Sequence, residues 1–427
     1  MLLLLSASGW AQQHLVATTA QLQRALSQAS AQDEVVLAAG VYHTQVQIDK
    51  PLIVSGSAAA IIDAGGRGSA LVLGSNDITI RGLSIRNWGA DLYQHDAAIR
   101  GRDIANIQLL DNQLSGPGFG IRFDNASNVD IRGNQITGAL QGALLQRGDT
   151  IYLKNVSATR ITANTLVGGR DGVYLESSDN VVITDNRMSQ QQYPVHFMYA
   201  KDSSASGNDS QQVLGGYAIM GSKRIDVIGN RLRDAIEFGL LLNMSTDSRL
   251  LHNDVARVTN PRADHVFDGE GKGVFIYGAQ NNTISGNRLQ QCQIGISMAM
   301  GGEGNRIDGN QFVHNGTQVK YVGTAVLDWS HDGVGNYWSS YSGWDLNGDG
   351  IGDQSYRPND ALDRLFWIYP EGRFLMNSPV ITVLRWLQRQ FQQEQGSGIH
   401  DSHPLMTPPI TAQMKTQRQV SLTSQLE

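Results

Sequence analysis

Cysteine, charge and long apolar runs are all scarce in this chain of 427 residues. The single cysteine, Cys292, cannot form a disulfide within the chain, and its place just before a predicted strand indicates a small buried thiol. Charged residues make up only 17% of the chain and the net charge is −6, which argues against a nucleic-acid partner. Beyond the first eleven residues, no stretch is apolar over a length that would span a bilayer.

Residues 1–11 (MLLLLSASGWA) resemble the apolar region of a signal peptide that ends in Gly-x-Ala. This run is too short to cross a membrane. The basic segment that normally precedes such a region is absent, so either the leader is truncated or its start lies elsewhere. We expect an exported, soluble protein that works in the periplasm.

The chain has instead abundant glycine, 47 residues, and an asparagine that recurs at a nearly fixed interval. Successive members of this asparagine ladder are separated by 22, 30, 22, 22, 22, 23, 34, 23 and 26 residues. Its members are Asn112, Asn134, Asn164, Asn186, Asn208, Asn230, Asn253, Asn287, Asn310 and Asn336. In the short steps, apolar residues stand two or three places before the asparagine and two places after it. Ordinary hairpins would not hold this register over consecutive intervals.

Short alternating strands repeated at about 22 residues predict an all-β fold, a right-handed parallel β-helix. The asparagine amides should bond backbone groups of the coils above and below, stacked within one turn. A helix over residues 21–31, with Leu22, Leu26 and Ala29 on one face, is expected to cap the open end of the solenoid. The two longest steps mark insertions near 148–155 and 257–272, which in a solenoid often gather on a binding face.

Four regions are therefore predicted. They are a signal peptide at 1–11, the β-helix at 12–340, an acidic loop with an amphipathic helix at 341–400, and a mostly flexible tail at 401–427. The helix should begin at Ser378-Pro379, with Ser as N-cap and Pro at the first position. Its apolar stripe comprises Val380, Ile381, Val383, Leu384, Leu387 and Phe391. Such a stripe either plugs the solenoid end, lies on a membrane surface or docks a partner.

Methionines and histidines on one strand face form the first candidate site. If Val195 and Phe197 point inward, His196 and Met198 point outward. Met220 follows Met198 by 22 residues, one coil later in the same column. Coils stack about 4.8 Å apart and a metal–sulfur bond is about 2.3 Å, so two thioethers of adjacent coils fit one ion. Thioether with imidazole favours Cu(I), although methionine in a β-protein also serves simply to fill gaps.

Further soft ligands follow along the same part of the chain. The candidate copper set is His196, Met198, Met220, Met244, His265 and Met300. Copper would be a transient cargo in the Cu(I) state.

A second candidate site is the motif Asp345-x-Asn347-x-Asp349-Gly350-x-x-Asp353, which matches the opening of a calcium loop. The carboxylate expected at the twelfth position is missing, and Asp360 or Asp363 are candidate substitutes. We predict a structural calcium ion here, against a turn that only uses aspartate and asparagine to bond its own backbone.

A polysaccharide lyase or epimerase is the alternative function, because such enzymes use acidic and basic side chains along one β-helix face. The residues that fit this interpretation are Arg170, Asp171, His196, Tyr199, Lys201 and Asp202. The same face carries methionines and apolar residues, whereas a uronate groove requires more Arg and Lys. We therefore predict that the protein is not an enzyme.

Several long motifs resemble one known family. They are YPVHFMYAKDS (193–203), GGYAIMGS (215–222), FGLLLNMS (238–245), GEGKGVFIYGA (269–279), GISMAMGGEGN (295–305), GNYWSSYSGWDLNGDGIGD (335–353), SPVITVLRWLQRQF (378–391) and HPLMTP (403–408). Together they resemble the NosD family, periplasmic maturation factors for the copper site of nitrous oxide reductase. The resemblance implies a non-catalytic β-helix that docks an ABC transporter permease with its ATPase, works with a copper chaperone lipoprotein, and helps to build the copper–sulfide centre of the reductase. It does not itself identify the copper ligands. Peripheral membrane contact through the C-terminal helix is expected, and no nucleic acid.

Overall fold

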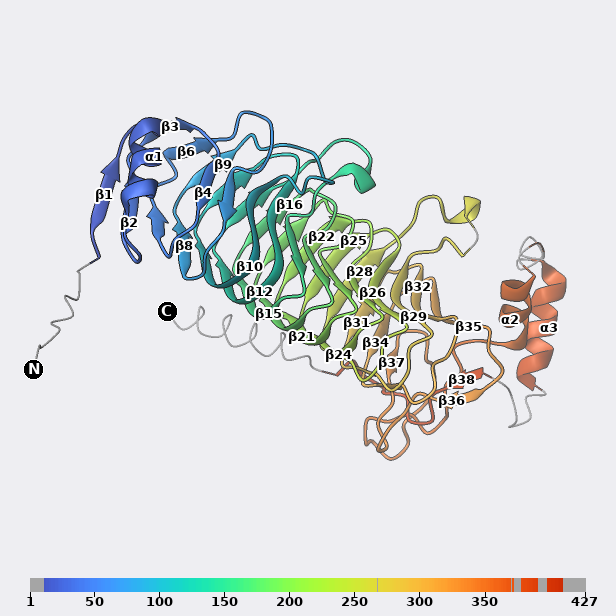
Figure 1. The fold of residues 1–427 in the computed structure, drawn as a ribbon. Coiled ribbons are helices and arrows are strands. Elements are labelled where there is room, and N and C mark those ends of the chain that lie inside the picture. The colour runs from blue at the N-terminus through green and yellow to red at the C-terminus, as the bar shows by residue number, and fades with distance from the viewer. Residues whose placement is uncertain (1–10, 267, 370, 372–377, 391–397, 410–427) are drawn as a thin grey trace, which may run out of the picture. The chain divides into compact units, whose positions relative to one another are not determined.

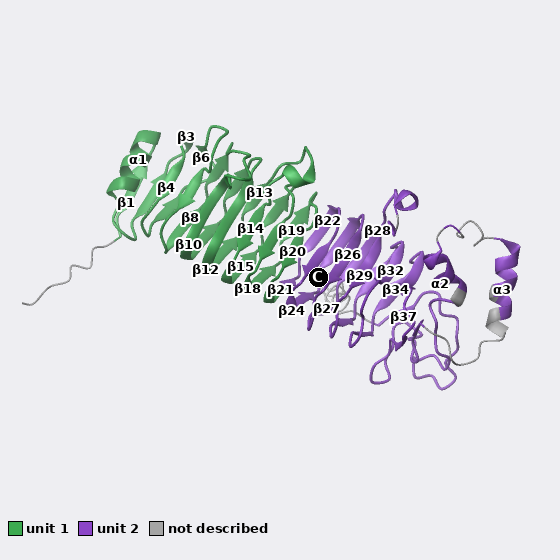
Figure 2. Ribbon diagram, turned by 45° about the vertical axis from the view of Figure 1, so that its right-hand side comes forward, with its two compact units in different colours: residues 1–204 green, residues 205–427 purple. Residues whose placement is uncertain are grey.

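The computed structural model describes residues 11–266, 268–369, 371, 378–390 and 398–409. The predicted signal peptide therefore lies, apart from residue 11, outside the described residues. The chain forms a parallel β-solenoid of about 14 turns with few helices, which confirms the predicted fold class (Figure 1). It divides into two compact units, residues 1–204 and 205–427 (Figure 2). Each unit is described by itself.

Each coil of the first unit contributes strands to two parallel sheets. The strands of the larger sheet are β1 (Gln13–Val16), β2 (Glu34–Leu37), β4 (Val46–Ile48), β5 (Ile53–Ser55), β7 (Leu71–Leu73), β8 (Ile78–Arg81), β10 (Ala97–Leu110), β12 (Phe119–Arg132), β14 (Ile151–Lys154), β15 (Ser157–Thr162), β17 (Val173–Glu176), β18 (Asp179–Thr184) and β20 (Val195–Met198); β21 (Lys201–Ser206) ends just past the unit boundary. Those of the smaller sheet are β3 (Gly40–His43), β6 (Ala60–Asp63), β9 (Ser84–Arg86), β11 (Gln113–Ser115), β13 (Gln135–Thr137), β16 (Thr165–Val167) and β19 (Arg187–Ser189). A short helix, η1 (Leu144–Gln146), lies in the first insertion.

The second unit repeats this plan. Its larger sheet contains β23 (Tyr217–Met220), β24 (Lys223–Ile228), β26 (Phe238–Asn243), β27 (Arg249–Leu251), β29 (Lys272–Tyr277), β30 (Thr283–Ser285), β32 (Ile294–Met298), β33 (Arg306–Asp308) and β35 (Thr317–Tyr321). Its smaller sheet contains β22 (Asp209–Val213), β25 (Arg231–Ala235), β28 (Asp254–Val258), β31 (Arg288–Gln290), β34 (Gln311–Val313) and β37 (Tyr337–Trp338), and a separate pair joins β36 (Val326–Asp328) to β38 (Gly398–His400). The second insertion contains the short helix η2 (Ala263–His265).

The strands form where small and β-branched apolar residues alternate with polar ones. In β17, Val173 and Leu175 are fully buried, whereas Tyr174 and Glu176 are half-buried on the outer face. Because consecutive strands pair in parallel register, equivalent positions form columns of like side chains along the solenoid. The core of each unit is the stack of inward-facing Val, Ile, Leu and Phe side chains.

The asparagine ladder lies in one turn of each coil, as predicted. In the first unit, Asn134 Oδ1 accepts hydrogen bonds from both the backbone N–H and the side-chain amide of Asn112, each at 3.0 Å. In the second unit, the backbone N–H and the side-chain amide of Asn287 donate the same two hydrogen bonds to Asn310 Oδ1. The ladder asparagines are at most 1% exposed. They satisfy buried backbone groups that the turn cannot pair as strand.

The predicted N-terminal helix is present as α1 (Thr19–Gln28). Thr18 caps it by accepting a hydrogen bond from the Gln21 backbone N–H. Leu22 and Ala25 are buried, and the helix packs beside β1 and β2 at the start of the first unit (Figure 1).

The last coil of the second unit is covered by loops. The ring of Trp338 stacks on Phe312 with centroids 4.0 Å apart, and Trp329 lies 6.3 Å from both rings. Residues 398–409 return to this coil, where Asp401 is fully buried and Leu405 pairs with Tyr337. Residues 401–409, at the start of the predicted and mostly flexible tail, thus supply hydrogen bonds to the final coil. Residues 410–427 lie outside the described residues.

Two helices precede that return segment. The first, α2 (Ala361–Ile368), begins with a capping box in which Asp360 and Asp363 bond each other's backbone N–H. The second, α3 (Pro379–Gln390), covers the predicted amphipathic segment. Its residues Val380, Val383, Leu384, Trp386 and Leu387 are exposed, whereas Ile381 is buried. Phe391, the last member of the predicted stripe, lies outside the described residues. No helix in the described part of the chain is both long and apolar enough to cross a bilayer.

Candidate metal-binding site

His196 is the most unusual side chain on the outer face of the first unit. It stands on β20 between inward-facing Val195 and Phe197, so the predicted alternation is correct. Its side chain is nevertheless buried, only 7% exposed. Nδ1 lies 3.0 Å from Asp171 Oδ2, while Nε2 is buried without a hydrogen-bond partner among the described residues. Asp171 thus orients an imidazole whose second nitrogen is unused, an arrangement typical of metal-ligating histidines.

Aromatic rings enclose this imidazole. Tyr174, one coil earlier in the same column, and Tyr193 both meet the His196 ring edge-to-face, with centroids 4.8 and 5.2 Å away. Tyr152 stacks on Tyr174 at 5.2 Å. The rings hold His196 in one orientation and keep water away from it.

A buried ion-pair network supports Asp171. Arg170 binds Asp149 through Nε and Nη2, both at 2.9 Å, and its Nε lies 3.7 Å from Asp171. Asp171 also accepts the backbone N–H of Tyr193. Burial and the neighbouring charge of Asp171 raise the pKa of Asp149 to about 7. The carboxylates of Asp149 and Asp171 each accept several hydrogen bonds, so the position of Asp171 beside His196 is well defined.

Met198 lies two residues beyond His196 on the same outer face and is half-buried. In the column of Met198, the two preceding coils place Glu176 and Lys154, which form an ion pair at 2.7 Å. His196 and Met198 thus present one imidazole and one thioether from a single strand.

The other predicted thioethers belong to the second unit. Met220 is half-buried at the end of β23, and the next two coils place Asn243 and Tyr277 in its column. Met244 and Met300 are exposed, and both belong to the adjacent turn column, with Gly278 between them. A Cβ on Gly278 would lie 3.4 Å from Met244 Cγ, so Met244 extends over the glycine. Because Gly278 has no side chain, no side chain of that coil separates the thioethers of Met244 and Met300.

His265 occupies a different setting. It is exposed at the end of η2 and lines a cavity of about 620 Å³ together with Met298, Tyr277 and Trp367. Lys320 pairs with Asp268 at 2.6 Å and with Glu270 at 3.3 Å, which fastens the second insertion to β35.

The predicted calcium residues form a closed turn. Asp345 accepts the backbone N–H groups of Gly348, Asp349 and Gly350. Asp353 accepts the N–H of Leu346, and the Asn347 amide donates to Asp349. The proposed substitutes Asp360 and Asp363 cap α2 instead. Among the described residues, no group of three or more His, Cys, Asp or Glu side chains is arranged to hold a metal ion.

The residues of the polysaccharide-enzyme alternative divide into two groups. Arg170, Asp171 and His196 belong to the buried network. Tyr199 is exposed in the turn after β20, and Lys201 and Asp202 are exposed at the start of β21.

Two features of the site were not predicted. Asp171 was predicted only as part of the polysaccharide-enzyme interpretation, not as a hydrogen-bond partner of His196. The rings of Tyr174 and Tyr193 around His196 were not predicted. The signal for Tyr174 was present, since it precedes His196 by one coil of 22 residues. The 25-residue offset of Asp171 belongs to no repeat.

Comparison with known proteins identifies relatives of nearly the whole chain. Residues 139–343 match the family described as periplasmic copper-binding protein (NosD), and residues 17–238 match a family of unknown function. "Probable ABC transporter binding protein NosD" of Stutzerimonas stutzeri is 39% identical over 90% of this chain and 88% of its own length. The protein of that name from Pseudomonas aeruginosa is 42% identical over 87% of this chain and 88% of its own length.

Solved structures of low identity share the fold. A DFA-IIIase of Arthrobacter chlorophenolicus has a TM-score of 0.55 at 14% identity, covering 74% of this chain and 96% of its own. The A-module of the Azotobacter vinelandii mannuronan C-5 epimerase AlgE6 has a TM-score of 0.55 at 12% identity, covering 72% and 93%. At such identities the likeness concerns architecture alone. The relatives of about 40% identity extend along both units, and on that evidence the chain belongs to the NosD family of periplasmic copper-binding proteins.

Proposed function

We propose that this protein is a non-catalytic maturation factor that handles Cu(I) for the copper–sulfide centre of nitrous oxide reductase. It would receive copper from a chaperone lipoprotein and act with the permease and ATPase of an ABC transporter. The family description and the names of the relatives support copper binding in the periplasm and association with a transporter. The reductase and the chaperone are part of the proposal.

The observation that carries the copper proposal is the Asp171–His196 pair. In the tautomer that donates Nδ1–H to Asp171, the lone pair lies on the buried Nε2, which has no hydrogen-bond partner among the described residues. A soft monovalent ion suits this nitrogen when a thioether joins it, and Met198 on the same strand supplies one.

The exposed thioethers of the second unit suit a different step. Met244 extends over Gly278, the following coil places Met300 beside that glycine, and both thioethers are exposed soft donors. A surface pair of this kind is suited to fast exchange of Cu(I) with a partner. Met220 lies on the adjacent strand end.

Titration of the purified protein with Cu(I) against a competing chelator tests these assignments. We expect His196→Ala and Met198→Leu to weaken binding at the first site at least tenfold, and Met220→Leu or the double variant Met244→Leu/Met300→Leu to weaken binding at the second. Met188→Leu is the matched control, because Met188 is a buried core methionine of β19. Equal affinity in all variants would rule out these ligands while leaving a docking role intact.

The transporter dock is proposed to be α3. Its exposed residues Val380, Val383, Leu384 and Leu387 form one apolar stripe, and α2 exposes Leu365 and Ile368. A patch of this kind marks an interaction surface on a water-soluble protein. It would rest on the periplasmic face of the permease or on the membrane surface beside it.

Replacing Leu384 and Leu387 with Asp tests the dock. Because both side chains are exposed, the thermal midpoint should stay nearly unchanged while capture of the permease–ATPase complex is lost. Replacing Thr382, an exposed polar residue of the same helix, with Asp is the control. A loss of several degrees with capture retained would instead identify α3 as a structural cap.

A structural calcium ion in the loop 345–353 is a separate proposal. The alternation of carboxylate and amide side chains supports it, since Ca²⁺ prefers oxygen ligands in a flexible loop. Binding would require the carboxylates of Asp345, Asp349 and Asp353 to exchange their bonds to loop N–H groups for bonds to the ion.

A further inference from the structure

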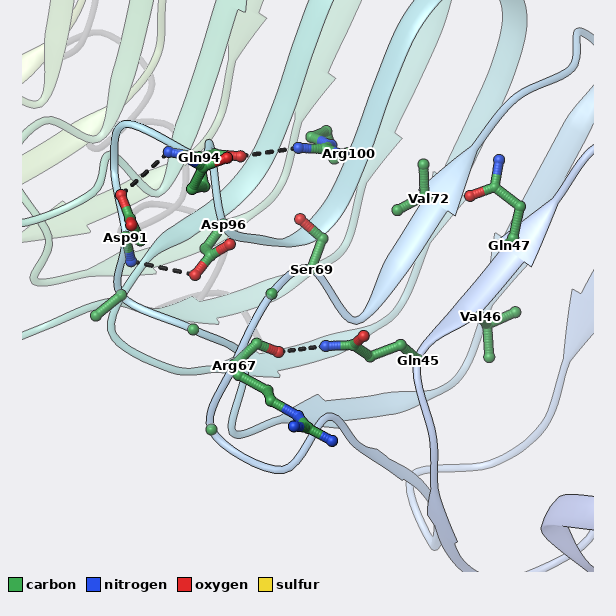
Figure 3. A pocket seen from close by; sticks show the side chains of 14 residues that line it. Gln45, Val46, Gln47, Arg67, Ser69, Val72, Asp91, Gln94, Asp96 and Arg100 are labelled. Atoms are coloured by element: carbon green, nitrogen blue, oxygen red, sulfur yellow. Dashed lines mark hydrogen bonds between the residues drawn. The ribbon is translucent and has the colours of Figure 1, made fainter.

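A polar hollow of about 740 Å³ lies on the outer face of the first unit, and the functions proposed above do not use it. Its floor is a column of three outward-facing residues on successive coils, Gln47 of β4, Val72 of β7 and Arg100 of β10. A second hollow of about 350 Å³ adjoins it and shares Val72 and Arg100. Figure 3 shows the side chains that line the larger hollow.

The walls of this hollow are held by backbone hydrogen bonds. In the loop 89–96, Asp91 Oδ1 accepts the N–H groups of Tyr93 and Gln94, and Asp96 Oδ2 accepts the N–H of Asp91. The opposite wall, the turn at 66–69, is joined to this loop by a bond from Gly89 N–H to Gly68 O at 2.9 Å. The hollow is therefore formed before any ligand binds, which lowers the entropy cost of binding.

The guanidinium donors in the hollow remain largely unused, whereas two of its amides already donate, Gln45 Nε2 to Arg67 O and Gln47 Nε2 to Asp49 Oδ1. Arg100 donates one Nη1 bond to Gln94 O, at 2.9 Å, and has no carboxylate partner among the described residues (Figure 3). Arg67 is exposed and makes no side-chain hydrogen bond within the described part of the chain. The carboxylates of Asp91 and Asp96, by contrast, already accept loop N–H groups. The donors available to a ligand are thus mainly the guanidinium groups.

Arginines are the main charged groups that line the adjoining hollow. His95 lines this hollow together with Arg100 and Arg102. The carboxylate in its lining, Asp124, is already paired with the buried Arg122. Burial, and then the charges of Arg122, Arg100 and Arg102, lower the pKa of His95. Arg100 and Arg102 are two residues apart on β10, so their side chains lie on the same face of the strand. Both guanidinium groups can therefore reach one anion or two neighbouring anionic groups of a ligand.

We propose that the two adjoining hollows bind an acidic oligosaccharide of the uronate type, with carboxylates on Arg67, Arg100 and Arg102 and hydroxyls on the glutamine amides. Gln45, Gln47 and Gln94 all line the larger hollow, and their amide oxygens accept hydrogen bonds from hydroxyl groups. A peptide partner would require apolar anchor pockets, and the hollow offers only Val46 and Val72 as large apolar groups. Tyr93, at 95% exposure, stands in the same loop as a stacking platform for a sugar ring.

Calorimetric titration of the full-length protein with a hexameric oligogalacturonate tests this proposal. We expect saturable binding that weakens at least tenfold in Arg100→Gln and in Arg67→Gln, and that weakens with added salt. Arg160→Gln is the control, because Arg160 is an exposed arginine of β15 in the same unit and lines neither hollow. Since Arg67 is exposed, its replacement leaves folding intact even if Arg100→Gln does not.

Three probes distinguish the outcomes. Maltohexaose, a neutral oligosaccharide, should bind at least tenfold more weakly than the uronate hexamer. A hexaglutamate peptide, which is acidic but not a sugar, should also bind at least tenfold more weakly. Equal binding of the peptide, or equal loss in Arg160→Gln, would reduce the effect to general electrostatics and overturn the proposal. Absence of binding up to 10 mM uronate hexamer, roughly the weakest affinity that a specific site would show, would overturn it as well.

Discussion

Asp401 ends the asparagine ladder by accepting the backbone N–H of Asn336 at 2.7 Å, across 65 residues of sequence. The same carboxylate oxygen accepts the indole N–H of Trp338, also at 2.7 Å. Earlier rungs donate this N–H to the asparagine of the following coil, as Asn310 does to Asn336 at 3.0 Å. At the last coil no further asparagine follows, and an aspartate from the returning segment takes its place.

Replacing Asp401 with Ala should destabilise the second unit strongly. Two buried donors would lose their acceptor, at a cost of about 1–3 kcal/mol each. Urea unfolding followed by tryptophan fluorescence measures the effect, and Asp401→Asn should recover part of it because one oxygen remains. Asp332→Ala, at an exposed site four residues before Asn336, should change the midpoint little.

The interior of the ladder should be equally sensitive. Asn164 Oδ1 accepts from Asn134 N–H at 2.9 Å, and its amide donates to Ile131 O and to Asn186. We expect Asn164→Ala to cost about 3 kcal/mol or more, because several buried groups lose partners together. Asn128→Ala is the control, because the Asn128 amide donates a hydrogen bond to Asn106 at an exposed position. If Asn128→Ala and Asn164→Ala shift the urea midpoint equally, burial of the ladder is not what stabilises the coil.

Asp171→Asn should lower the Cu(I) affinity of the first site by roughly 10- to 100-fold, as loss of an orienting carboxylate does at other metal sites. The amide retains the shape of the carboxylate but no longer favours the Nδ1–H tautomer. A change in the X-ray absorption spectrum of the bound Cu(I), from mixed nitrogen and sulfur ligands toward sulfur alone, would distinguish a positioning role from simple destabilisation. Unchanged affinity and spectrum would separate Asp171 from copper binding.

Acid should weaken the N-terminal cap through Asp33. Hydrogen bonds from His14 and from the backbone N–H groups of Gln12 and Ser30 lower the pKa of Asp33 from 3.8 to about 2. A lowered pKa stabilises the folded state above the pKa of the unfolded chain, and this contribution is lost as the pH falls through about 2. Asp33→Asn should therefore be less stable than the parent at pH 6, with the difference shrinking from pH 4 downward. Asp77→Asn, at an exposed position, is the control in the same denaturation series.

Calcium should raise the stability of the second unit if the loop 345–353 binds it. At a free concentration about 100 times Kd, binding adds about 2.7 kcal/mol to the free energy of unfolding. A chelator should reverse this shift, and Asp349→Ala with Asp353→Ala should abolish it. Equal thermal midpoints with millimolar calcium and with chelator would show that the loop needs only its own hydrogen bonds.

Sequence periodicity alone was sufficient to predict the solenoid, the stacked asparagines, α1 and α3, because each depends on residues that repeat at one coil length or on local capping. The same alternation correctly predicted that His196 and Met198 face outward, since side-chain direction in a strand follows from position.

Tertiary structure alone decided what the repeat does not encode. The bond from Asp171 to His196 spans 25 residues, and the bond from Asn336 to Asp401 spans 65, so neither falls in a column. Insertions and the returning segment 398–409 change which side chains meet. Burial of His196 depends on rings from Tyr174 and Tyr193, and closure of the last coil depends on Asp401. Contacts of this kind arise when the chain folds back on itself, because the energy of a buried polar group is set by the neighbours that surround it in space.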